Sequence, residues 1–305
     1  MTGTATGTTG TPPSHAQQPA PHSCGTESPR LGAPANSCDC HMHIYDNRFP
    51  AVAGPAPLNF PVNAYRLLQK RIGTTRTVIV SPKVYGTDHR CTLDAISQLG
   101  STATRGIAVV HPNVTDADLR RLADAGIRGI RFTVGKPAVA VTTIDMIEPL
   151  AKRIDDLGWH VQIHMLADQI VENADLLQRV VSPIVFDHMG RLPQPAGIKH
   201  AAFQVIRRLL DKGRTWVKLS GAVFPDSKLG SPTYADLTEI AEAYIKAAPE
   251  RMVWGSDSPH ALEKEMPPDD VVLFDLLAQW AQDEPTRRRI LVDNPEALYG
   301  FPKSV

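Results

Sequence analysis

The stretch SCDCHMHIYD at positions 37–46 is the part of the sequence that most strongly decides the predicted fold. It is short and mixes apolar residues with regularly spaced polar ones, which is typical of a β-strand that carries functional groups. Side chains two positions apart share a face of a strand, so Asp39, His41 and His43 are expected to point into the fold, and Cys40 away from it. Two adjacent buried imidazoles indicate a functional site, and Asp39 is expected to orient one of them.

Seven further strand-like runs follow, rich in Val and Ile and bounded by Gly, Pro, Ser or Asp. They are TRTVIVSPK (75–83), TRGIAVVH (104–111), IRGIRFTV (127–134), GWHVQIHM (158–165), SPIVFDHMG (182–190), TWVKLSGA (215–222) and RMVWGSDSPH (251–260). Most segments between them have apolar residues at spacings of three and four, and several end in Gly, as helices do. Eight such units over about 270 residues predict a TIM-like (β/α)8 barrel. An open doubly wound sheet shares this alternation, but no G-x-G-x-x-G loop follows the first run.

The first 36 residues differ from the rest of the chain. Residues 1–36 are rich in Thr, Gly, Pro, Ala and Ser and contain almost no large apolar side chains. Such a segment buries too little surface to offset the entropy lost on ordering. We therefore expect a disordered tail over 1–36 and one barrel domain over 37–305.

Charge and cysteine content narrow the possible partners. Lys and Arg total 32, as do Asp and Glu, so the formal net charge is zero, which argues against a nucleic-acid or anionic-membrane partner. No apolar run approaches the roughly 20 residues that cross a bilayer. Four scattered cysteines do not make a disulfide framework, so a reducing compartment, the cytoplasm, is expected. These totals leave the oligomeric state open.

Polar residues at the ends of the predicted strands are the candidates for catalysis, because the active site of a (β/α)8 barrel lies at the C-terminal ends of its strands. His41 and His43 end the first strand, His188 follows the sixth, and Asp257 follows the eighth. We predict these four as catalytic residues. A lone histidine such as His164, at the end of the fifth strand, is more often a hydrogen-bonded structural residue.

Basic residues near the same strand ends are candidates for substrate binding. Arg131 ends the fourth strand, Arg191 lies just beyond the sixth, and Lys83 follows the second. These side chains are suited to hold a substrate carboxylate, and arginine does so through two parallel hydrogen bonds. A structural ion pair of Arg131 with Asp39 or Glu148 is the alternative.

Several motifs together resemble a known family. An Asp-x-His-x-His first strand, a His after the sixth strand and a Trp-Gly-Ser-Asp-x-Pro-His last strand are similar to the amidohydrolase superfamily. The closer resemblance is to the branch of 2-pyrone-4,6-dicarboxylate lactonase, sugar-acid lactonases, 4-sulfomuconolactone hydrolase and galactarolactone isomerase. The matching pieces are DCHMHIYD (39–46), YGTDHRCTLDAI (85–96), GIRGIRF (126–132), VFDHMGR (185–191), VKLSGA (217–222), MVWGSDSPH (252–260) and NPEALYGF (294–301). The resemblance implies a barrel enzyme acting on lactones, and it adds Tyr85 and Asp88 to the predicted substrate-binding residues.

The chemistry implied by this resemblance is the opening of a carboxylated lactone, either a sugar-acid lactone or a pyrone. Water would add to the ring carbonyl while Asp257 takes its proton and passes it to the leaving alkoxide. His41, His43 and His188 would donate to the oxyanion. The alternatives are a lactone isomerase, in which a substrate hydroxyl replaces water, a metal-dependent decarboxylase, and a non-catalytic sugar-acid binding protein.

A metal is a separate question for this site. We favour a reaction that requires none, because the arginines and the lysine can polarise an acidic substrate. The alternative is one zinc ion, which accepts imidazole nitrogen and carboxylate oxygen. The ligands would then come from His41, His43, His164, His188 and Asp257. Two metals are not expected, because the fourth strand, IRGIRFTVG, offers no evident bridging ligand.

Overall fold

The computed structural model describes residues 19–52, 54, 58–136, 140–220, 226–263 and 265–303. Eight parallel strands form one sheet in sequence order, and contacts between the first and last strands bring its two edges together. The strands are β1 (Cys38–Met42), β2 (Arg76–Val80), β3 (Thr104–Ala108), β4 (Ile127–Thr133), β5 (His160–His164), β6 (Ile184–Phe186), β7 (Thr215–Ser220) and β8 (Met252–Gly255). The predicted (β/α)8 barrel is confirmed.

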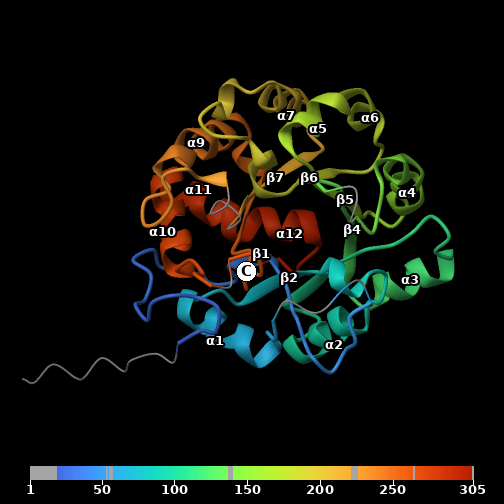
Figure 1. Ribbon diagram of the computed structural model, residues 1–305, viewed down its shortest axis with the longest axis horizontal. Helices are drawn as coiled ribbons and strands as arrows, with labels where there is room; N and C mark the ends of the chain where they lie inside the picture. The colour runs from blue at the N-terminus through green and yellow to red at the C-terminus, as the bar shows by residue number, and fades with distance from the viewer. Residues whose placement is uncertain are drawn as a thin grey trace, which may run out of the picture.

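Helices surround the strands from α1 round to α9 in chain order, except that α6 lies between α4 and α5, and α10 contacts α1 to complete the ring (Figure 1). The helices of the described residues are α1 (Val62–Ile72), α2 (Arg90–Leu99), α3 (Asp116–Asp124), α4 (Ile147–Asp155), α5 (Ala167–Glu172), α6 (Ala174–Arg179), α7 (Ala201–Asp211), α9 (Thr238–Ala247), α10 (Asp270–Trp280), α11 (Glu284–Arg288) and α12 (Asn294–Tyr299). Among the described residues, none of these helices is long and apolar enough to cross a membrane.

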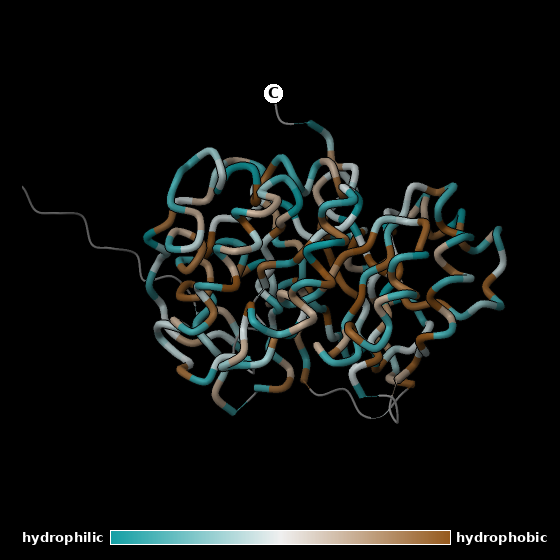
Figure 2. The backbone as a smooth tube through the Cα atoms, turned by 90° about the horizontal axis from the view of Figure 1, so that it is seen from above, coloured by the Kyte–Doolittle hydropathy of each residue, from teal (hydrophilic) through white to brown (hydrophobic). Residues whose placement is uncertain are grey.

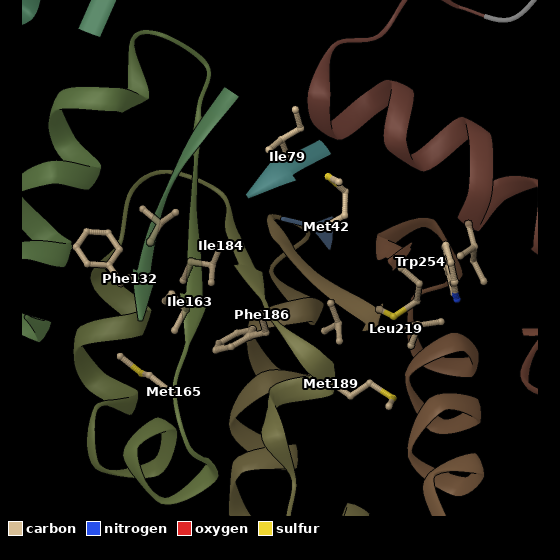
Figure 3. Close-up of a cluster of buried hydrophobic side chains, with 14 of the residues drawn as sticks. Met42, Ile79, Phe132, Ile163, Met165, Ile184, Phe186, Met189, Leu219 and Trp254 are labelled. Atoms are coloured by element: carbon tan, nitrogen blue, oxygen red, sulfur yellow. The ribbon is translucent and has the colours of Figure 1, made fainter. Parts of the chain in front are cut away.

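The apolar residues of the strands form two separate layers. Outward-facing side chains such as Phe132, Phe186 and Leu219 pack between the strands and the helices (Figure 3). Inward-facing Cys38, Cys40, Val78, Val80, Ile107, Val185 and Val253 form a second cluster with Tyr299 of α12. Hydrophilic positions predominate along the outer turns (Figure 2). Helix α12 thus closes the end of the barrel at which the strands begin, and the opposite end is left for the site.

The register of β1 against β2 shifts within β1, which changes the direction of its side chains. Cys38 and Cys40 both belong to the inner cluster, whereas Asp39 lies on the outer side, where its Oδ2 accepts from the Tyr65 hydroxyl of α1 at 3.1 Å. After the shift, His41 faces inward. The expectation that Asp39 points inward and Cys40 outward is therefore wrong, because an irregularity of the bulge type breaks the alternation of a regular strand.

Asp39 closes the barrel and does not orient an imidazole. Its carboxylate accepts from the backbone N–H of Ser256 at 2.9 Å and from the Ser256 hydroxyl at 2.7 Å. The next residue, Asp257, donates its backbone N–H to the carbonyl of His41 at 2.7 Å. Gly255 allows this approach, because a Cβ there would lie 2.6 Å from the Cβ of His41. These bonds tie the ends of β1 and β8 together.

The tail prediction needs a correction for the residues that the structure describes. Residues 1–18 lie outside the described part, but 19–36 pack on the barrel. Ala20 is 2% exposed, and Arg71 of α1 donates to the carbonyl of Cys24 at 2.7 Å. Charged side chains of the barrel hold the segment through its backbone groups, and Leu31 packs against the core, so the segment orders with little apolar surface of its own.

Candidate active site

The four residues predicted as catalytic lie together at the C-terminal end of the barrel. The ring centroids of His41 and His43 are 5.1 Å apart, and those of His41 and His188 are 4.7 Å apart. The Oδ1 of Asp257 lies 3.4 Å from the Nε2 of His41 and 3.4 Å from the Nε2 of His43. The cluster is largely buried, which strengthens each electrostatic interaction within it.

The backbone is strained at three of the predicted site residues. The φ angles are 63° at Asp257, 53° at His188 and 51° at Arg191, all in the left-handed region. Residues with a Cβ rarely adopt this conformation, and such strain clusters at functional sites. Burial raises the pKa of Asp257, but the imidazoles of His188, His43 and His41 more than offset this and hold that pKa well below its usual range. Asp257 is therefore a carboxylate at neutral pH.

His43 is held between a backbone carbonyl and Asp257. Its Nδ1 lies 2.7 Å from the carbonyl oxygen of Val80, which only accepts, so Nδ1 carries the proton. Its Nε2 faces the Oδ1 of Asp257 at 3.4 Å. The predicted role of His43 as an oxyanion donor stays a prediction.

His41 lies between a carboxylate and an ammonium group. Its Nδ1 is 3.2 Å from the Oδ1 of Asp187 and 3.3 Å from the Nζ of Lys218, and the contact with Lys218 has the geometry of a hydrogen bond. An ammonium only donates, so in this contact Nδ1 accepts and Nε2 carries the proton. Burial and the charge of Lys218 lower the pKa of His41 to about 3, so the ring is neutral.

His188 completes the cluster from the loop after β6. Its Nδ1 contacts the hydroxyl of Ser220 at the end of β7. Burial holds the pKa of His188 well below its usual range, so this ring is neutral too. When the Ser220 hydroxyl donates to Nδ1, the Nε2 of His188 carries the proton and can donate to a substrate oxygen.

Arg131 is paired with a residue that the sequence analysis did not single out. Its Nε donates to the Oδ2 of Asp187 at 2.9 Å, and the Asp187 side chain is fully buried. Burial raises the pKa of Asp187, but Arg131, His41 and Lys218 more than offset this, so it is ionised. The structural partner of Arg131 is therefore Asp187 rather than Asp39 or Glu148, and much of its charge is balanced within the protein.

His164 does not belong with the predicted metal ligands. Its Nδ1 lies 3.1 Å from Nη2 of Arg131, and its Nε2 lies 3.3 Å from Nη1 of Arg191. Burial and the charge of Arg131 hold its pKa well below the usual range. Both ring nitrogens face guanidinium donors, so no lone pair is left for a metal ion.

Arg191 lies at the mouth of the site. Its Nε is 2.6 Å from the Oδ2 of Asp226, and its side chain is 17% exposed. It lines a cavity of about 240 Å³ together with Asp226, Asp168 and Lys228. Arg191 is thus a charged group that an entering substrate can reach.

The three residues predicted around the exit of β2 have different surroundings. Asp88 is paired with Arg90 at 2.6 Å, so its carboxylate is already occupied, which argues against the predicted contact with substrate. The hydroxyl of Tyr85 accepts from the backbone N–H of Asp46 at 2.9 Å and holds the loop after β1. Lys83 is exposed on a short 3-10 helix.

Two buried charged residues beneath the imidazoles were missed. Asp187 precedes His188, and Lys218 lies within the apolar strand β7, where it donates to the carbonyl of Cys40 and to Gln162 Oε1, both at 2.8 Å. Burial lowers the pKa of Lys218 to about 8, so it remains protonated at neutral pH. The available signal was a lysine at a central strand position between Val and Leu, because such a side chain needs buried partners.

Comparison with known proteins identifies the family. A sequence model of the amidohydrolase family matches residues 38–301, and the chain belongs to this family of enzymes. A 4-sulfomuconolactone hydrolase from Rhizobium radiobacter is 34% identical over 88% of this chain and 91% of its own length. A 2-pyrone-4,6-dicarboxylate hydrolase from Comamonas testosteroni is 32% identical, with 91% of this chain and 94% of the relative covered.

Two further similarities extend the comparison. A D-galactarolactone isomerase from Agrobacterium fabrum (strain C58) is 30% identical over 89% of this chain and 94% of its own. An Agrobacterium tumefaciens protein, solved as an apo crystal structure, superposes with a TM-score of 0.82 at 28% identity, with 91% of this chain and all of that chain covered. The resemblance noted in the sequence is confirmed.

Proposed function

We propose that this enzyme hydrolyses a carboxylated lactone, of the sugar-acid or pyrone type, with Asp257 as the general base. The observation that carries the proposal is the convergence of the Nε2 atoms of His41 and His43 on the Oδ1 of Asp257, at 3.4 Å each. Beside these rings the carboxylate is suited to accept a hydrogen bond from a water molecule whose oxygen then faces the substrate.

In the proposed reaction, the water oxygen adds to the ring carbonyl while one of its protons passes to Asp257. The N–H groups of His41 and His188 donate to the oxyanion that forms, in a buried site where such bonds are strong. Collapse of this intermediate breaks the ring C–O bond, and Asp257 returns the proton to the leaving alkoxide. The product is a hydroxy acid that has gained one water molecule.

Arg191 is the proposed anchor for a carboxylate of the substrate. It lies beside the cluster, lines the cavity at the mouth, and keeps Nη atoms beyond its contact with Asp226. Lys83 is a second basic group at the exit of β2, and we keep it as a weaker proposal. The printed names of the relatives, which describe hydrolysis of 4-sulfomuconolactone and 2-pyrone-4,6-dicarboxylate, support an acidic lactone as substrate.

Isomerisation of a lactone is the second candidate. The similarity to D-galactarolactone isomerase supports it, and the same groups would serve if a substrate hydroxyl replaced water at the carbonyl. The two reactions differ in the source of the oxygen in the new acyl bond.

The proposed steps use only side chains of the chain, so we propose that no metal is required. One zinc ion remains the alternative, with His41, His43 and Asp257 as its ligands. The Nε2 of His41 is buried without a hydrogen-bond partner among the described residues, and it offers a lone pair in the tautomer whose Nδ1–H donates to Asp187. A bound zinc would act as a Lewis acid towards the carbonyl oxygen or water.

A small-molecule lactone is the proposed partner, with no nucleic acid or membrane. All four cysteines are unpaired, which supports a reducing compartment such as the cytoplasm.

A panel of lactones tests the proposed function. Acidic lactones of the sugar-acid and pyrone types are compared with the same compounds whose exocyclic carboxylate is a methyl ester. We expect ring opening of at least one acid, with kcat/KM at least about 10-fold lower for its ester because the charge-assisted contact with Arg191 is lost. Equal turnover of acid and ester would contradict the carboxylate anchor, and no ring opening of any acid would contradict the function.

A further inference from the structure

We propose that residues 20–31, here called the N-terminal arm, position Asp257 for catalysis through a chain of contacts that runs by way of Asp270 and His260. This inference rests on the proposed function, because it concerns the residue that acts there as the base.

The turn that carries Asp257 is strained, and it is held at both of its ends. Asp257 and His260 both have positive φ, 63° and 56°. The backbone N–H of His260 donates to the carbonyl of Asp257 at 3.2 Å. The first part of the turn is bonded to the end of β1, through the N–H of Asp257 to the carbonyl of His41 and the N–H of His43 to the carbonyl of Ser258. Since a strained conformation persists only where its surroundings hold it, the position of Asp257 depends also on what holds the other end, at His260.

His260 is held by the first residue of α10. Its Nε2 lies 3.0 Å from the Oδ1 of Asp270, and the two side chains are 1% and 0% exposed. A carboxylate only accepts, so the imidazole donates in this contact. The pair fixes the end of the turn to the start of α10.

The arm in turn holds the start of α10. The backbone N–H of Asp270 donates to the hydroxyl of Ser23 at 3.2 Å. Cys24 donates its backbone N–H to the carbonyl of Pro268 at 3.1 Å and its thiol to the carbonyl of Pro267 at 2.7 Å. Three residues at the start of α10, Pro267, Pro268 and Asp270, are therefore bonded to two residues of the arm.

Arg71, at the end of α1, binds the arm and also the residue before α10. Its side chain is fully buried, and it pairs with Asp269 at 2.9 Å. The same guanidinium donates to the carbonyls of Cys24 at 2.7 Å and Glu27 at 3.0 Å. This buried arginine has no role in the site itself. Its contacts hold the arm and the segment after β8, residues 256–269, together.

One position in the arm allows a sharp test. Gly25 has a φ of +72°, and a Cβ there would lie 2.2 Å from the Oδ2 of Asp269 and 3.0 Å from Nη2 of Arg71. Gly32 directly follows the arm, and a Cβ there would meet nothing within 4 Å. Gly25→Ala should therefore displace the arm from the start of α10. Gly32→Ala adds the same methyl group where there is space for it, so it is a matched control.

The experiment measures hydrogen exchange of the arm and of the segment 257–270, together with kcat and KM for the lactone identified as substrate. For Gly25→Ala we expect faster exchange in both segments and a loss of about 10- to 100-fold in kcat, because small displacements of a reacting group are costly, with KM within about twofold of native. For Gly32→Ala we expect native values throughout.

The outcomes separate this inference from the proposed function. Faster hydrogen exchange in the arm with a native kcat would overturn the inference. Unchanged exchange would overturn it too, because it would mean that Gly25 is not closely packed against α10. The proposed function is tested separately by Asp257→Asn. If this variant keeps its activity, Asp257 is not the base, whatever effect the arm has.

A second pair of variants avoids the arm and keeps the proposal testable if Gly25→Ala fails to fold. Asp270→Ala removes the acceptor for His260, whereas Asp270→Asn keeps an oxygen there. We expect Asp270→Ala to lose about 10-fold or more in kcat and Asp270→Asn to retain most of it. Equal activity of Asp270→Ala and the native enzyme would overturn the link between His260 and Asp257.

Discussion

The Nζ of Lys218 lies 3.3 Å from the Nδ1 of His41, and neither side chain is exposed to solvent. The ammonium donates its other hydrogens to Cys40 and Gln162, so it is fixed in place by the barrel interior. Its contact with His41 assigns the proton of this imidazole to Nε2, the nitrogen that faces the site. The competing contact with Asp187, at 3.2 Å, favours the opposite tautomer, which is the one a metal ion would need.

The first prediction concerns this tautomer. In protein labelled with ¹⁵N-histidine, the signals of His41, assigned by their loss in His41→Asn, should show a protonated Nε2 and an unprotonated Nδ1. Lys218→Met should lower kcat by about 10²-fold, the usual effect of losing one oxyanion donor. Lys152→Met, an exposed lysine on α4, is the matched control and should have no effect. A native His41 with its proton on Nδ1 would contradict the assignment.

The sequence predicted those parts of the site that depend on local pattern. The His-x-His pair and Asp257 each end a recognisable strand, and the rule that places barrel sites at strand ends brought them together. Asp187 and Lys218 were missed because their partners lie on other strands, 56 residues away for Arg131 and Asp187.

Two other errors had the same physical origin. The outward direction of Asp39 follows from an irregularity in strand pairing, and a single strand's alternation does not reveal it. The arm contacts the segment after β8 about 240 residues away, as in the bond between Cys24 and Pro267, and its composition does not contain this information.

The second prediction concerns Asp257. Asp257→Asn keeps the shape of the side chain and removes the base, so we expect kcat to fall by about 10²- to 10⁴-fold, with folding and KM largely unchanged. Steady-state kinetics and a thermal melt check this, with Asp211→Asn, at an exposed carboxylate of α7, as a control. A variant with more than about a tenth of native kcat would place water activation elsewhere.

The pH profile provides a second check on the same base. The reaction needs ionised Asp257, so activity should be lost as the pH falls through its pKa, which the imidazoles hold well below the usual range. We expect kcat/KM to stay flat from about pH 7 down to about pH 4. A limb between pH 6 and 7, typical of a histidine base, would argue against Asp257.

The third prediction concerns Arg191. Arg191→Ala should raise KM for an acidic lactone by about 10-fold or more, and Arg191→Lys should restore only part of the affinity, because lysine lacks the planar fork. Arg179→Ala, which removes an exposed arginine paired with Glu148, is the control. Native KM values for both Arg191 variants would remove this residue from substrate binding.

The fourth prediction concerns metal. We expect purified enzyme to contain well under one zinc per chain and to keep its activity after treatment with a chelator, because the proposed steps use only side chains. Elemental analysis before and after chelation, paired with the activity assay, checks this. If the enzyme contains one zinc per chain and loses turnover when the zinc is removed, the alternative is established, in which His41, His43 and Asp257 bind a zinc ion.

The fifth prediction is the most direct test of lactone hydrolysis. The native enzyme is supplied with its carboxylated lactone in ¹⁸O-labelled water, and the product is analysed by mass spectrometry after a single turnover. The account predicts one ¹⁸O atom in the newly formed carboxylate, because the nucleophile is the water that Asp257 deprotonates. A product of unchanged mass with no ¹⁸O would contradict hydrolysis and establish attack by a hydroxyl of the substrate itself.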